Sequence, residues 1–179
     1  MGSKPPDAFL SYTRFDDRND GGAISELRKR LADAVHAVSG EPFTIFQDVD
    51  GIGPGEHWPG KLAQLLNDVR FFIPILTPSY FASKACRDEL QKSLKAEAER
   101  GRNDLVLPIY YIECDVLEHA DARAADPVAQ VIHERGPQHL VKIGYRLGVG
   151  RYPLTFDEYD YFAQISQAAL RLISSLRSI

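Results

Sequence analysis

The sequence CRDEL places a thiol and two carboxylates close together on an expected helix, and such groups can act as nucleophiles or as acids and bases. With Leu90 at the centre of the apolar stripe of that helix, the helical repeat puts Cys86 beside it, in the core. Asp88 falls on the opposite, solvent side. Glu89 falls on the border, where a half-buried carboxylate can acquire a functional role, although a solvated helix glutamate is the commoner outcome. Glu89 is therefore the first candidate for chemistry.

A second candidate is the glycine-rich segment DVDGIGPGEHWPG, which has features of a calcium loop and of a phosphate-binding loop. An EF-hand that begins at Asp48 requires an oxygen ligand where this chain has Ile52 and a glutamate where it has Pro59. A dinucleotide fingerprint requires a third glycine where this chain has Glu56, whose carboxylate would repel a pyrophosphate. Both interpretations fail, which leaves a pliable connection between a strand and a helix.

Other signatures of enzymes and metal sites are absent from the sequence. It contains no G-x-x-x-x-G-K-[ST] and no G-x-S-x-G, and its five histidines form no H-E-x-x-H. A phosphate-accepting receiver domain requires an aspartate at the end of the third strand, where this chain has Leu76, Thr77 and Pro78. Cys86 and Cys114 form no C-x-x-C pair. We therefore expect no metal site, no disulfide framework and no phosphoryl transfer.

Charged and aromatic side chains accompany both candidates. Arg14 lies near three acidic residues, Asp16, Asp17 and Asp20, in an expected loop, and we favour a solvated cluster about twofold over a binding role. Trp58, the single tryptophan, lies in the glycine-rich segment. There it either packs as an anchor of the loop or offers a surface for stacking.

The composition is that of one folded domain. The chain has 179 residues, of which 44% are hydrophobic, and a net charge of -4. Residues 1–6 are expected to form a tail, with Met1–Ser3 resembling residues left by cloning, and residues 7–179 to form the domain. The absence of a lysine or arginine run argues against a nucleic-acid partner, and the apolar runs are too short for a membrane span. With two cysteines, a cytoplasmic location fits best.

Short apolar segments alternate with amphipathic ones along the chain. This alternation predicts an α/β fold of three layers, with a central, mostly parallel five-stranded sheet covered on both faces by helices. The expected strands are residues 8–12, 43–47, 71–76, 105–112 and 139–145. The expected helices are residues 23–38, a segment around 62–69, one long helix that begins between Thr77 and Ser83 and stops at Gly101, a short helix near 127–132 and a closing helix over 162–176.

In such a sheet the working residues gather at the carboxyl ends of the strands. That edge would receive Tyr12 with Arg14 after the first strand and Asp48 after the second. Thr77 would follow the third strand, and the turn at residues 113–115 the fourth. The sequence therefore predicts that residues from four separate segments share one rim.

Four motifs, DAFLSYTR, IFQDVDGIGPGEHW, FFIPILTPSYFASKACRDEL and VLPIYY, together resemble the Toll/interleukin-1 receptor (TIR) domain in its bacterial form. Their order and spacing match, they extend from Asp7 to Tyr111, and the remaining helices agree in order. The resemblance implies a flavodoxin-like fold. It also identifies Asp48–Pro59 as the BB loop of the family, which mediates self-association between TIR domains and borders the substrate pocket.

Many such domains cleave NAD+ at the nicotinamide glycosidic bond, and the family's catalytic glutamate matches Glu89. The resemblance thus implies an NAD+ glycohydrolase or cyclase, with NAD+ as substrate and no cofactor, that serves bacterial defence or signalling under a sensor domain outside this sequence. Tyr12 and Arg14 would line the nucleotide pocket, Asp48 would fix the base of the BB loop, and Trp58 would offer a stacking surface. Nicotinamide leaves as a neutral ring, so a single carboxylate that stabilises the ribosyl cation is sufficient.

The chain departs from active members of the family at Ala85, where these often carry tryptophan. Loss of an aromatic wall would weaken substrate binding by about 1–3 kcal/mol unless Trp58 replaces it. Two alternatives stay open: a non-catalytic TIR–TIR interaction module, as an adaptor or a virulence factor, and a small α/β enzyme for another nucleotide-like substrate, such as a nucleoside deoxyribosyltransferase. The product, whether ADP-ribose, a cyclic isomer or a base-exchanged dinucleotide, also stays open.

Overall fold

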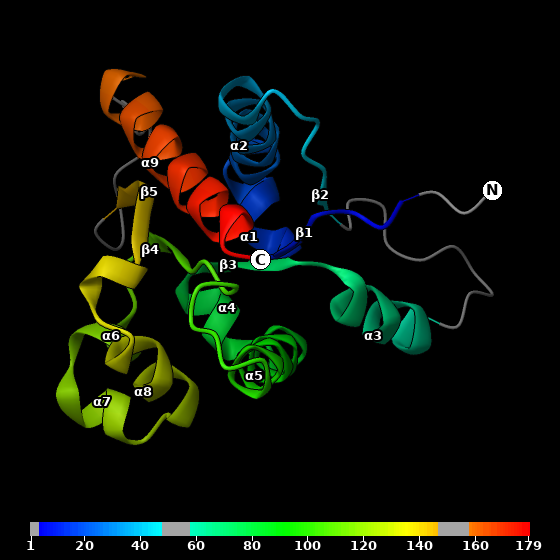
Figure 1. Ribbon diagram of the computed structural model, residues 1–179. Coiled ribbons are helices and arrows are strands. Elements are labelled where there is room, and N and C mark those ends of the chain that lie inside the picture. The colour runs from blue at the N-terminus through cyan, green and yellow to red at the C-terminus, as the bar shows by residue number, and fades with distance from the viewer. Residues whose placement is uncertain (1–3, 48–57, 147–157) are drawn as a thin grey trace.

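A computed structural model describes residues 4–47, 58–146 and 158–179, which form a sheet with helices on both faces (Figure 1). The strands are β1 (Ala8–Ser11), β2 (Ile45–Phe46), β3 (Phe71–Leu76), β4 (Ile109–Ile112) and β5 (Val141–Arg146). They lie in the order β2-β1-β3-β4-β5, and each pairs in parallel with its neighbours. This is the strand order of a flavodoxin-like, doubly wound sheet, which confirms the predicted fold class.

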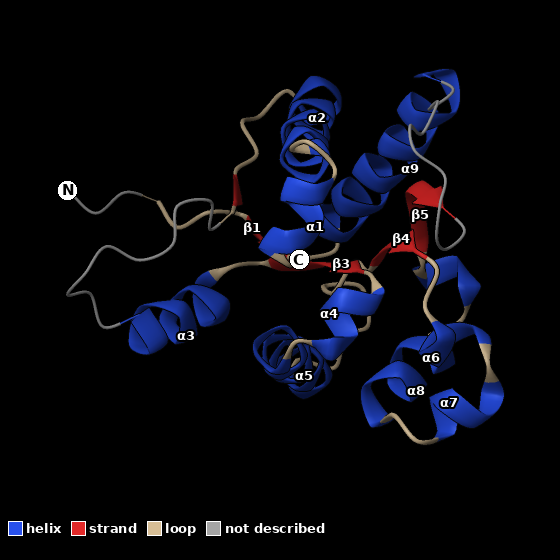
Figure 2. Cartoon of the chain, turned by 180° about the vertical axis from the view of Figure 1, so that it is seen from behind, coloured by secondary structure: helices blue, strands red, loops and turns tan. Residues whose placement is uncertain are grey.

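Helices connect successive strands, as a parallel sheet requires. In the described ranges they are α1 (Arg14–Asn19), α2 (Ala23–Ser39), α3 (Trp58–Asp68), α4 (Pro78–Ala82), α5 (Lys84–Glu99), α6 (Asp115–Glu118), α7 (Ala120–Ala124), α8 (Pro127–Glu134) and α9 (Glu158–Arg177), with a short 3-10 helix at Pro137–His139. Figure 2 shows the strands between the two groups of helices.

Two hydrophobic clusters, one on each face of the sheet, make up the core. On one face α2 and α9 pack side by side over the strands, and on the other lie α4 and α5 together with α6 and α8 (Figure 1). Along β3, Phe71, Ile73 and Ile75 belong to the first cluster, whereas Phe72 and Leu76 belong to the second. Because β3 is buried on both faces, its sequence FFIPIL is apolar throughout instead of alternating.

The structure differs from the predicted elements mainly where short helices occur. The expected loop after the first strand contains α1, and the irregular region after the fourth contains α6 and α7. Three strands also begin later than predicted. β2 is shorter, β4 begins at Ile109, although Val106 still makes an isolated bridge to Phe72, and β5 begins at Val141. The bounds of β3 are those predicted, and α2 ends one residue beyond its predicted end.

The expected long helix after β3 is two helices, because the segment contains two capping residues and each begins a helix of its own. The side chain of Thr77 accepts a hydrogen bond from the Tyr80 amide and begins α4, and the side chain of Ser83 accepts one from the Cys86 amide and begins α5. Gly101 follows the end of α5 with a φ of 66°, which is the left-handed conformation that glycine favours after a helix. The predicted stop at Gly101 is therefore confirmed.

Candidate functional site

The carboxyl ends of three strands meet at one edge of the sheet. Ser11 ends β1, Thr77 follows β3, and Cys114 lies two residues beyond the end of β4. All three are buried. Because the strands run in parallel, these positions and the helices that leave them face a common region. The predicted shared rim exists for the described part of the chain.

Glu89, on the first half of α5, points its carboxylate to this rim. Ser11 Oγ donates a hydrogen bond of 2.7 Å to Glu89 Oε2. Glu89 is partly buried, as its position on the border of the apolar stripe of α5 predicted, while Leu90 next to it is fully buried. The predicted helix geometry of this residue is confirmed, and its catalytic role stays a prediction.

Two buried hydroxyl groups lie behind the Glu89 carboxylate. The phenol of Tyr80 is fully buried, 2.8 Å from Ser11 Oγ and 3.2 Å from the carbonyl oxygen of Cys86. Burial raises the pKa of Tyr80 well above its ordinary value. Neither Ser11 nor Tyr80 is among the site residues predicted from the sequence, where the one signal is a serine near the end of the first expected strand.

Cys86 is a core residue, as predicted. Its side chain is buried, and its Sγ lies 3.8 Å from the backbone oxygen of Tyr12. Burial raises the pKa of the Cys86 thiol to about 11, and the nearby Glu89 and Asp16 carboxylates contribute to the same direction. At neutral pH the group is therefore a thiol and not a thiolate, which argues against a nucleophilic cysteine in this site.

The acidic cluster after β1 is not a solvated loop, which corrects the prediction. Asp16 is 5% exposed, and its Oδ2 accepts hydrogen bonds from Thr13 Oγ1 at 2.5 Å and from Thr77 Oγ1 at 2.6 Å. Thr13 also caps α1 by accepting from the Asp16 amide. The spacing of Thr13 and Asp16, S/T-x-x-acid, is a capping signature that could have predicted the start of this helix.

The other two aspartates of this cluster are also engaged. The Asp17 carboxylate accepts hydrogen bonds from the amide and the hydroxyl of Ser25 at 2.9 and 2.6 Å. These bonds connect α1 to the start of α2. Asp20 receives the hydroxyl of Tyr111 from β4 at 2.7 Å. The cluster therefore holds the segment after β1 in place.

The remaining predicted site residues are placed as follows. Tyr12 directly follows β1 and is half-buried, and Arg14 is the first residue of α1 and is exposed. Trp58 begins α3 instead of lying in a loop, which corrects its predicted position. Asp48 and most of the BB loop lie outside the described residues. Ala85, at the position of the family tryptophan, is exposed on α5, between its N-cap and Glu89.

Two ion pairs fasten α5 to α8 on the outer side of the site. Near Glu89, Arg87 donates to both carboxylate oxygens of Asp126 at 2.6 and 2.9 Å, and Asp126 caps α8. Near the far end of α5, the buried Glu97 accepts from the Arg135 guanidinium. The helix that carries Glu89 is thus attached at both ends.

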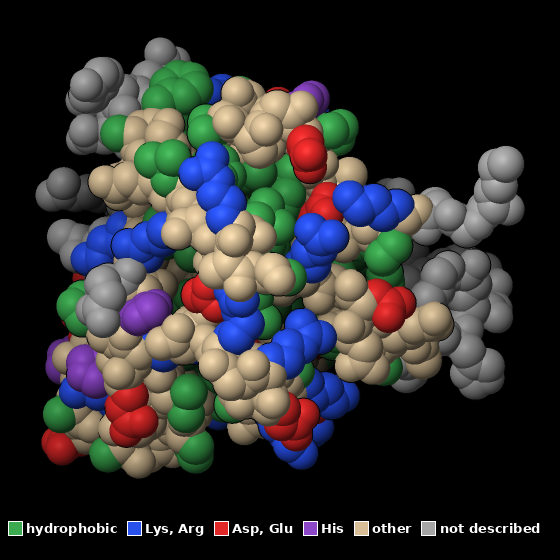
Figure 3. Space-filling view, viewed as in Figure 1, with side chains coloured by type: hydrophobic (Ala, Val, Ile, Leu, Met, Phe, Trp, Pro, Cys, Tyr) green, Lys and Arg blue, Asp and Glu red, His purple; other side chains and the backbone are tan. Residues whose placement is uncertain are grey.

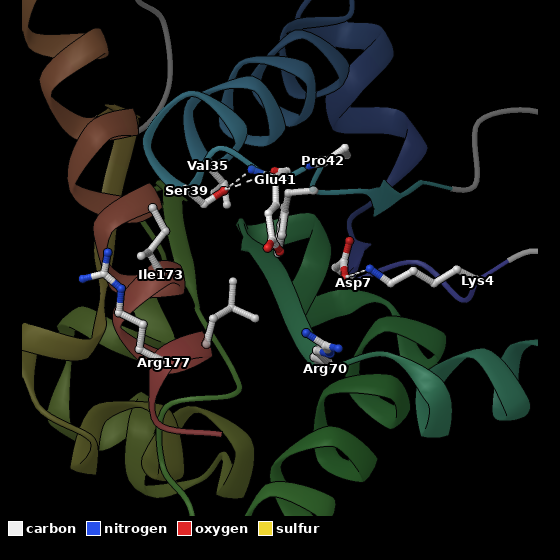
Figure 4. Close-up of a pocket in the computed structure, with 11 residues that line it drawn as sticks. Lys4, Asp7, Val35, Ser39, Glu41, Pro42, Arg70, Ile173 and Arg177 are labelled. Atoms are coloured by element: carbon white, nitrogen blue, oxygen red, sulfur yellow. Dashed lines mark hydrogen bonds and ion pairs between the residues drawn. The ribbon is translucent and has the colours of Figure 1, made fainter.

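Two of the hollows among the described residues lie at the opposite edge of the sheet, near the amino ends of the strands. One encloses about 250 Å3 and combines an apolar floor with charges of both signs (Figure 4); its charged residues are Lys4, Asp7, Glu41, Arg70 and Arg177. In this hollow Lys4 Nζ lies 3.3 Å from Asp7 Oδ1 and forms an ion pair with it. The other, of about 270 Å3, includes His139 and Arg171. Neither includes Glu89, so both are separate from the carboxyl-edge site.

The surface and the described elements add three observations. Basic and acidic side chains are interspersed over the face seen in Figure 3. Among residues 4–47, 58–146 and 158–179, no group of three or more His, Cys, Asp or Glu side chains is arranged to hold a metal ion. Within the same ranges, no helix combines the length and the apolar character that a membrane span needs.

The chain is similar to several solved TIR structures. The TIR domains of the activated Roq1 resistosome, which directly recognises the pathogen effector XopQ, are 17% identical, with a TM-score of 0.48 over 92% of this chain and 84% of that one. The TIR domain of the Toll-related receptor TRR-2 from Hydra magnipapillata is 20% identical, with a TM-score of 0.44 over 73% of this chain and 96% of that one. A metazoan TIR-STING receptor from C. gigas in complex with 2',3'-cGAMP is 18% identical, with a TM-score of 0.51 over 94% of this chain and 41% of the receptor.

No curated protein matched the chain. The sequence profile of the TIR domain matches residues 9–138, which run from the second residue of β1 through α8 and include the described residues of the carboxyl-edge site. That range is more than half of the sequence. The chain therefore belongs to the TIR domain family.

Proposed function

We propose that this TIR domain is an NAD+ glycohydrolase or cyclase that releases nicotinamide, with Glu89 as its catalytic residue. The observation that carries the proposal is the place of Glu89: a partly buried carboxylate at the carboxyl edge of a parallel sheet, oriented by a hydroxyl from the end of β1. Ligands bind at this edge in doubly wound folds. The domain would act as an effector in bacterial defence or signalling, with copies associating through the BB loop, Asp48–Pro59.

The proposed chemistry requires little beyond one well-placed negative charge. Cleavage of the glycosidic bond leaves nicotinamide as a neutral ring, so no acid has to protonate the leaving group. The ribosyl fragment becomes cation-like, and a fixed carboxylate beside it stabilises that charge by roughly 3–4 kcal/mol. The buried Cys86 and Tyr80 keep their protons, so neither supplies a negative charge, and the proposal gives that role to the Glu89 carboxylate. Tyr12 and Arg14 would contact the nucleotide.

The test is nicotinamide release from NAD+ by the concentrated or crowded protein. Glu89→Ala is expected to abolish release, since its side chain can no longer stabilise the cation. Glu99→Ala is the matched control, because Glu99 is an exposed glutamate on the same helix. Equal release by wild type and Glu89→Ala would sink the assignment of Glu89, and no release by wild type at any concentration would sink the enzymatic function.

A second candidate function is a TIR–TIR interaction module without turnover. Ala85 favours it, because an exposed alanine stands on α5 where active members of the family often carry a tryptophan. This function predicts concentration-dependent association of the chain in analytical ultracentrifugation, unchanged by Glu89→Ala, together with no nicotinamide release. The assay of nicotinamide release by wild type and Glu89→Ala therefore separates the two functions. The enzyme releases nicotinamide only as wild type, and the interaction module releases none in either form.

A further inference from the structure

A serine hydroxyl from the neighbouring strand holds the carboxylate of Glu89. Ser11 Oγ donates to Glu89 Oε2 over 2.7 Å, although the two residues are 78 positions apart in the chain. Ser11 is the last residue of β1 and is 2% exposed. A buried donor on a strand in the middle of the sheet restricts the side chain that it contacts more than a surface donor can, because strand and core fix the donor itself.

Ser11 is in turn oriented by Tyr80. The Tyr80 phenol lies 2.8 Å from Ser11 Oγ and 3.2 Å from the backbone oxygen of Cys86. Each hydroxyl has one proton to donate. Since Ser11 directs its proton to Glu89, the 2.8 Å contact between the two hydroxyls needs the proton of Tyr80, which Tyr80 shares between Ser11 Oγ and the Cys86 carbonyl oxygen. Burial keeps the phenol protonated by raising the pKa of Tyr80, so this donor is present at any ordinary pH.

Tyr80 is fixed by a further pair of contacts. Its amide donates to Thr77 Oγ1 at 3.0 Å, and Thr77 Oγ1 donates to the buried Asp16 Oδ2 at 2.6 Å. A continuous set of contacts therefore joins the segment before α4, α4 itself, the end of β1 and α5. Buried polar networks whose members are paired specify one arrangement and resist local distortion. The arrangement that they specify here is the direction of the Glu89 carboxylate.

We propose that Ser11 is a positioning residue for Glu89, and that Tyr80 holds the Ser11 hydroxyl in place. The inference rests on the proposed function, because it gives Ser11 a role in the same reaction. A misdirected carboxylate still lets NAD+ bind but stabilises the ribosyl cation less, so the loss falls on kcat and not on KM. A donor also draws charge from the carboxylate, and if that effect dominated, removal of Ser11 would accelerate the reaction.

Three variants test the proposal in the full chain. Ser11→Ala removes the hydroxyl, and Ser11→Thr keeps it. Ser175→Ala is the matched control, because Ser175 is another buried serine, 8% exposed, that bonds to a carboxylate, Asp104, toward the opposite edge of the sheet. We expect kcat for nicotinamide release to fall roughly 10- to 100-fold in Ser11→Ala, with KM within about twofold. The kcat of Ser11→Thr should lie within about threefold of the wild-type value, and the kcat of Ser175→Ala should equal the wild-type value.

Several outcomes would overturn the role of Ser11 while leaving that of Glu89 intact. These are a Ser11→Ala variant with wild-type or higher kcat, a loss confined to KM, or equal losses in Ser11→Ala and Ser11→Thr, provided that Glu89→Ala is inactive. Urea denaturation shows whether each variant is folded. Should Ser11→Ala fail to fold, Tyr80→Phe removes only the hydroxyl behind Ser11 and is expected to lower kcat roughly three- to tenfold. An unchanged kcat in Tyr80→Phe would then overturn the proposal.

A spectroscopic measurement separates this inference from the proposed function. If wild type releases no nicotinamide, the proposed function fails, and the contact is tested by carboxyl 13C NMR, with the Glu89 signal assigned by its loss in Glu89→Gln. We expect the signal to move in Ser11→Ala and to stay in place in Ser175→Ala, with Ser11→Thr close to wild type. A signal that does not move in Ser11→Ala means that Ser11 does not orient the carboxylate, and the inference is overturned.

Discussion

Two glutamates about two turns apart on α5 have opposite environments. Glu97 is 4% exposed, and its Oε2 accepts the backbone amides of Leu105 and Val106 at 2.8 and 2.6 Å. The Arg135 guanidinium binds both of its oxygens. Glu89 is partly buried at the other edge of the sheet and receives a neutral hydroxyl, Ser11. The helix α5 therefore carries two different carboxylates. That of Glu97 is enclosed by backbone amides and a cation, and that of Glu89 is oriented by a hydroxyl at the carboxyl edge of the sheet.

The two environments suit two roles on one helix, stability at Glu97 and stabilisation of a cation at Glu89. Full enclosure of Glu97 fixes the end of α5 against the segment before β4 and against the end of α8, so that stability is its expected contribution. A carboxylate that must stabilise a developing cation cannot be enclosed in the same way, because the substrate has to approach it. Sites of this kind are commonly held at some expense of stability. Substitutions along α5 and at its attachments to α8 test whether the two carboxylates differ in this way.

The largest effect is expected at the enclosed carboxylate. Glu97→Ala leaves two backbone amides without their acceptor and the Arg135 guanidinium, which is 10% exposed, without its counter-charge, and should lower the free energy of unfolding by about 3–5 kcal/mol. Urea denaturation at neutral pH measures this loss. A double-mutant cycle with Arg135→Ala sharpens the result, since the double variant should lose less than the sum of the single losses. A loss below about 1 kcal/mol for Glu97→Ala would contradict the role given to this enclosure.

A smaller effect is expected at the second attachment of α5. Asp126 caps α8 and pairs with Arg87, and Asp126→Ala should cost about 1–2 kcal/mol, mostly through the lost cap. Burial opposes ionisation of Asp126, but hydrogen bonds from Arg87 and two backbone amides outweigh it and lower the pKa of the carboxyl. Asp121→Ala, at an exposed position on α7, serves as the control.

The pH dependence of that variant follows from the sign of the shift. Because the pKa of Asp126 is lower in the folded protein than its unfolded value near 3.9, the carboxylate contributes its full stability above about pH 5. The contribution is lost as the pH falls through the folded pKa. The stability difference between wild type and Asp126→Ala should therefore shrink between about pH 5 and about pH 2. A difference that grows on acidification would contradict the pairing.

The sequence predicts the parts of this arrangement that depend on one element at a time. β3 was bounded correctly because FFIPIL is a continuous apolar run that ends at Thr77 and Pro78, where a cap and a proline begin a helix. The border position of Glu89 depends only on the spacing of the apolar residues of its own helix, and the structure agrees. The order of elements then predicted the parallel sheet and its carboxyl edge.

What the sequence could not reveal depends on contacts between distant segments. The partners of Ser11 lie 69 and 78 residues away, and no local pattern distinguishes this serine from one that faces solvent. Glu97 reads as one more polar residue in the sequence KAEAER, and its burial follows from the path of the chain around Leu105 and from Arg135. Asp16 appeared solvated for the same reason, because Thr77 arrives from another strand.

At the rim, stability and activity should separate. Glu89→Gln keeps an acceptor for the Ser11 hydroxyl and removes the negative charge, so the free energy of unfolding should change by less than about 1 kcal/mol in either direction. Nicotinamide release should nevertheless be lost with the charge. Parallel urea and activity measurements on the same preparation test this. A stability loss comparable to that of Glu97→Ala would mean that Glu89 is part of the framework, and the contrast between the two glutamates would disappear.

The smallest effect is expected at a third glutamate of the same helix. Glu99 Oε1 lies 3.9 Å from Lys95 Nζ, and both side chains are exposed, at 66% and 78%. Water and salt screen such a pair, so Glu99→Ala should change the free energy of unfolding by no more than about 0.5 kcal/mol, and added salt should remove even that difference. Urea denaturation at low and high ionic strength measures both. A loss near that of Glu97→Ala would show that position along α5, and not enclosure by amides and a cation, decides what a carboxylate contributes.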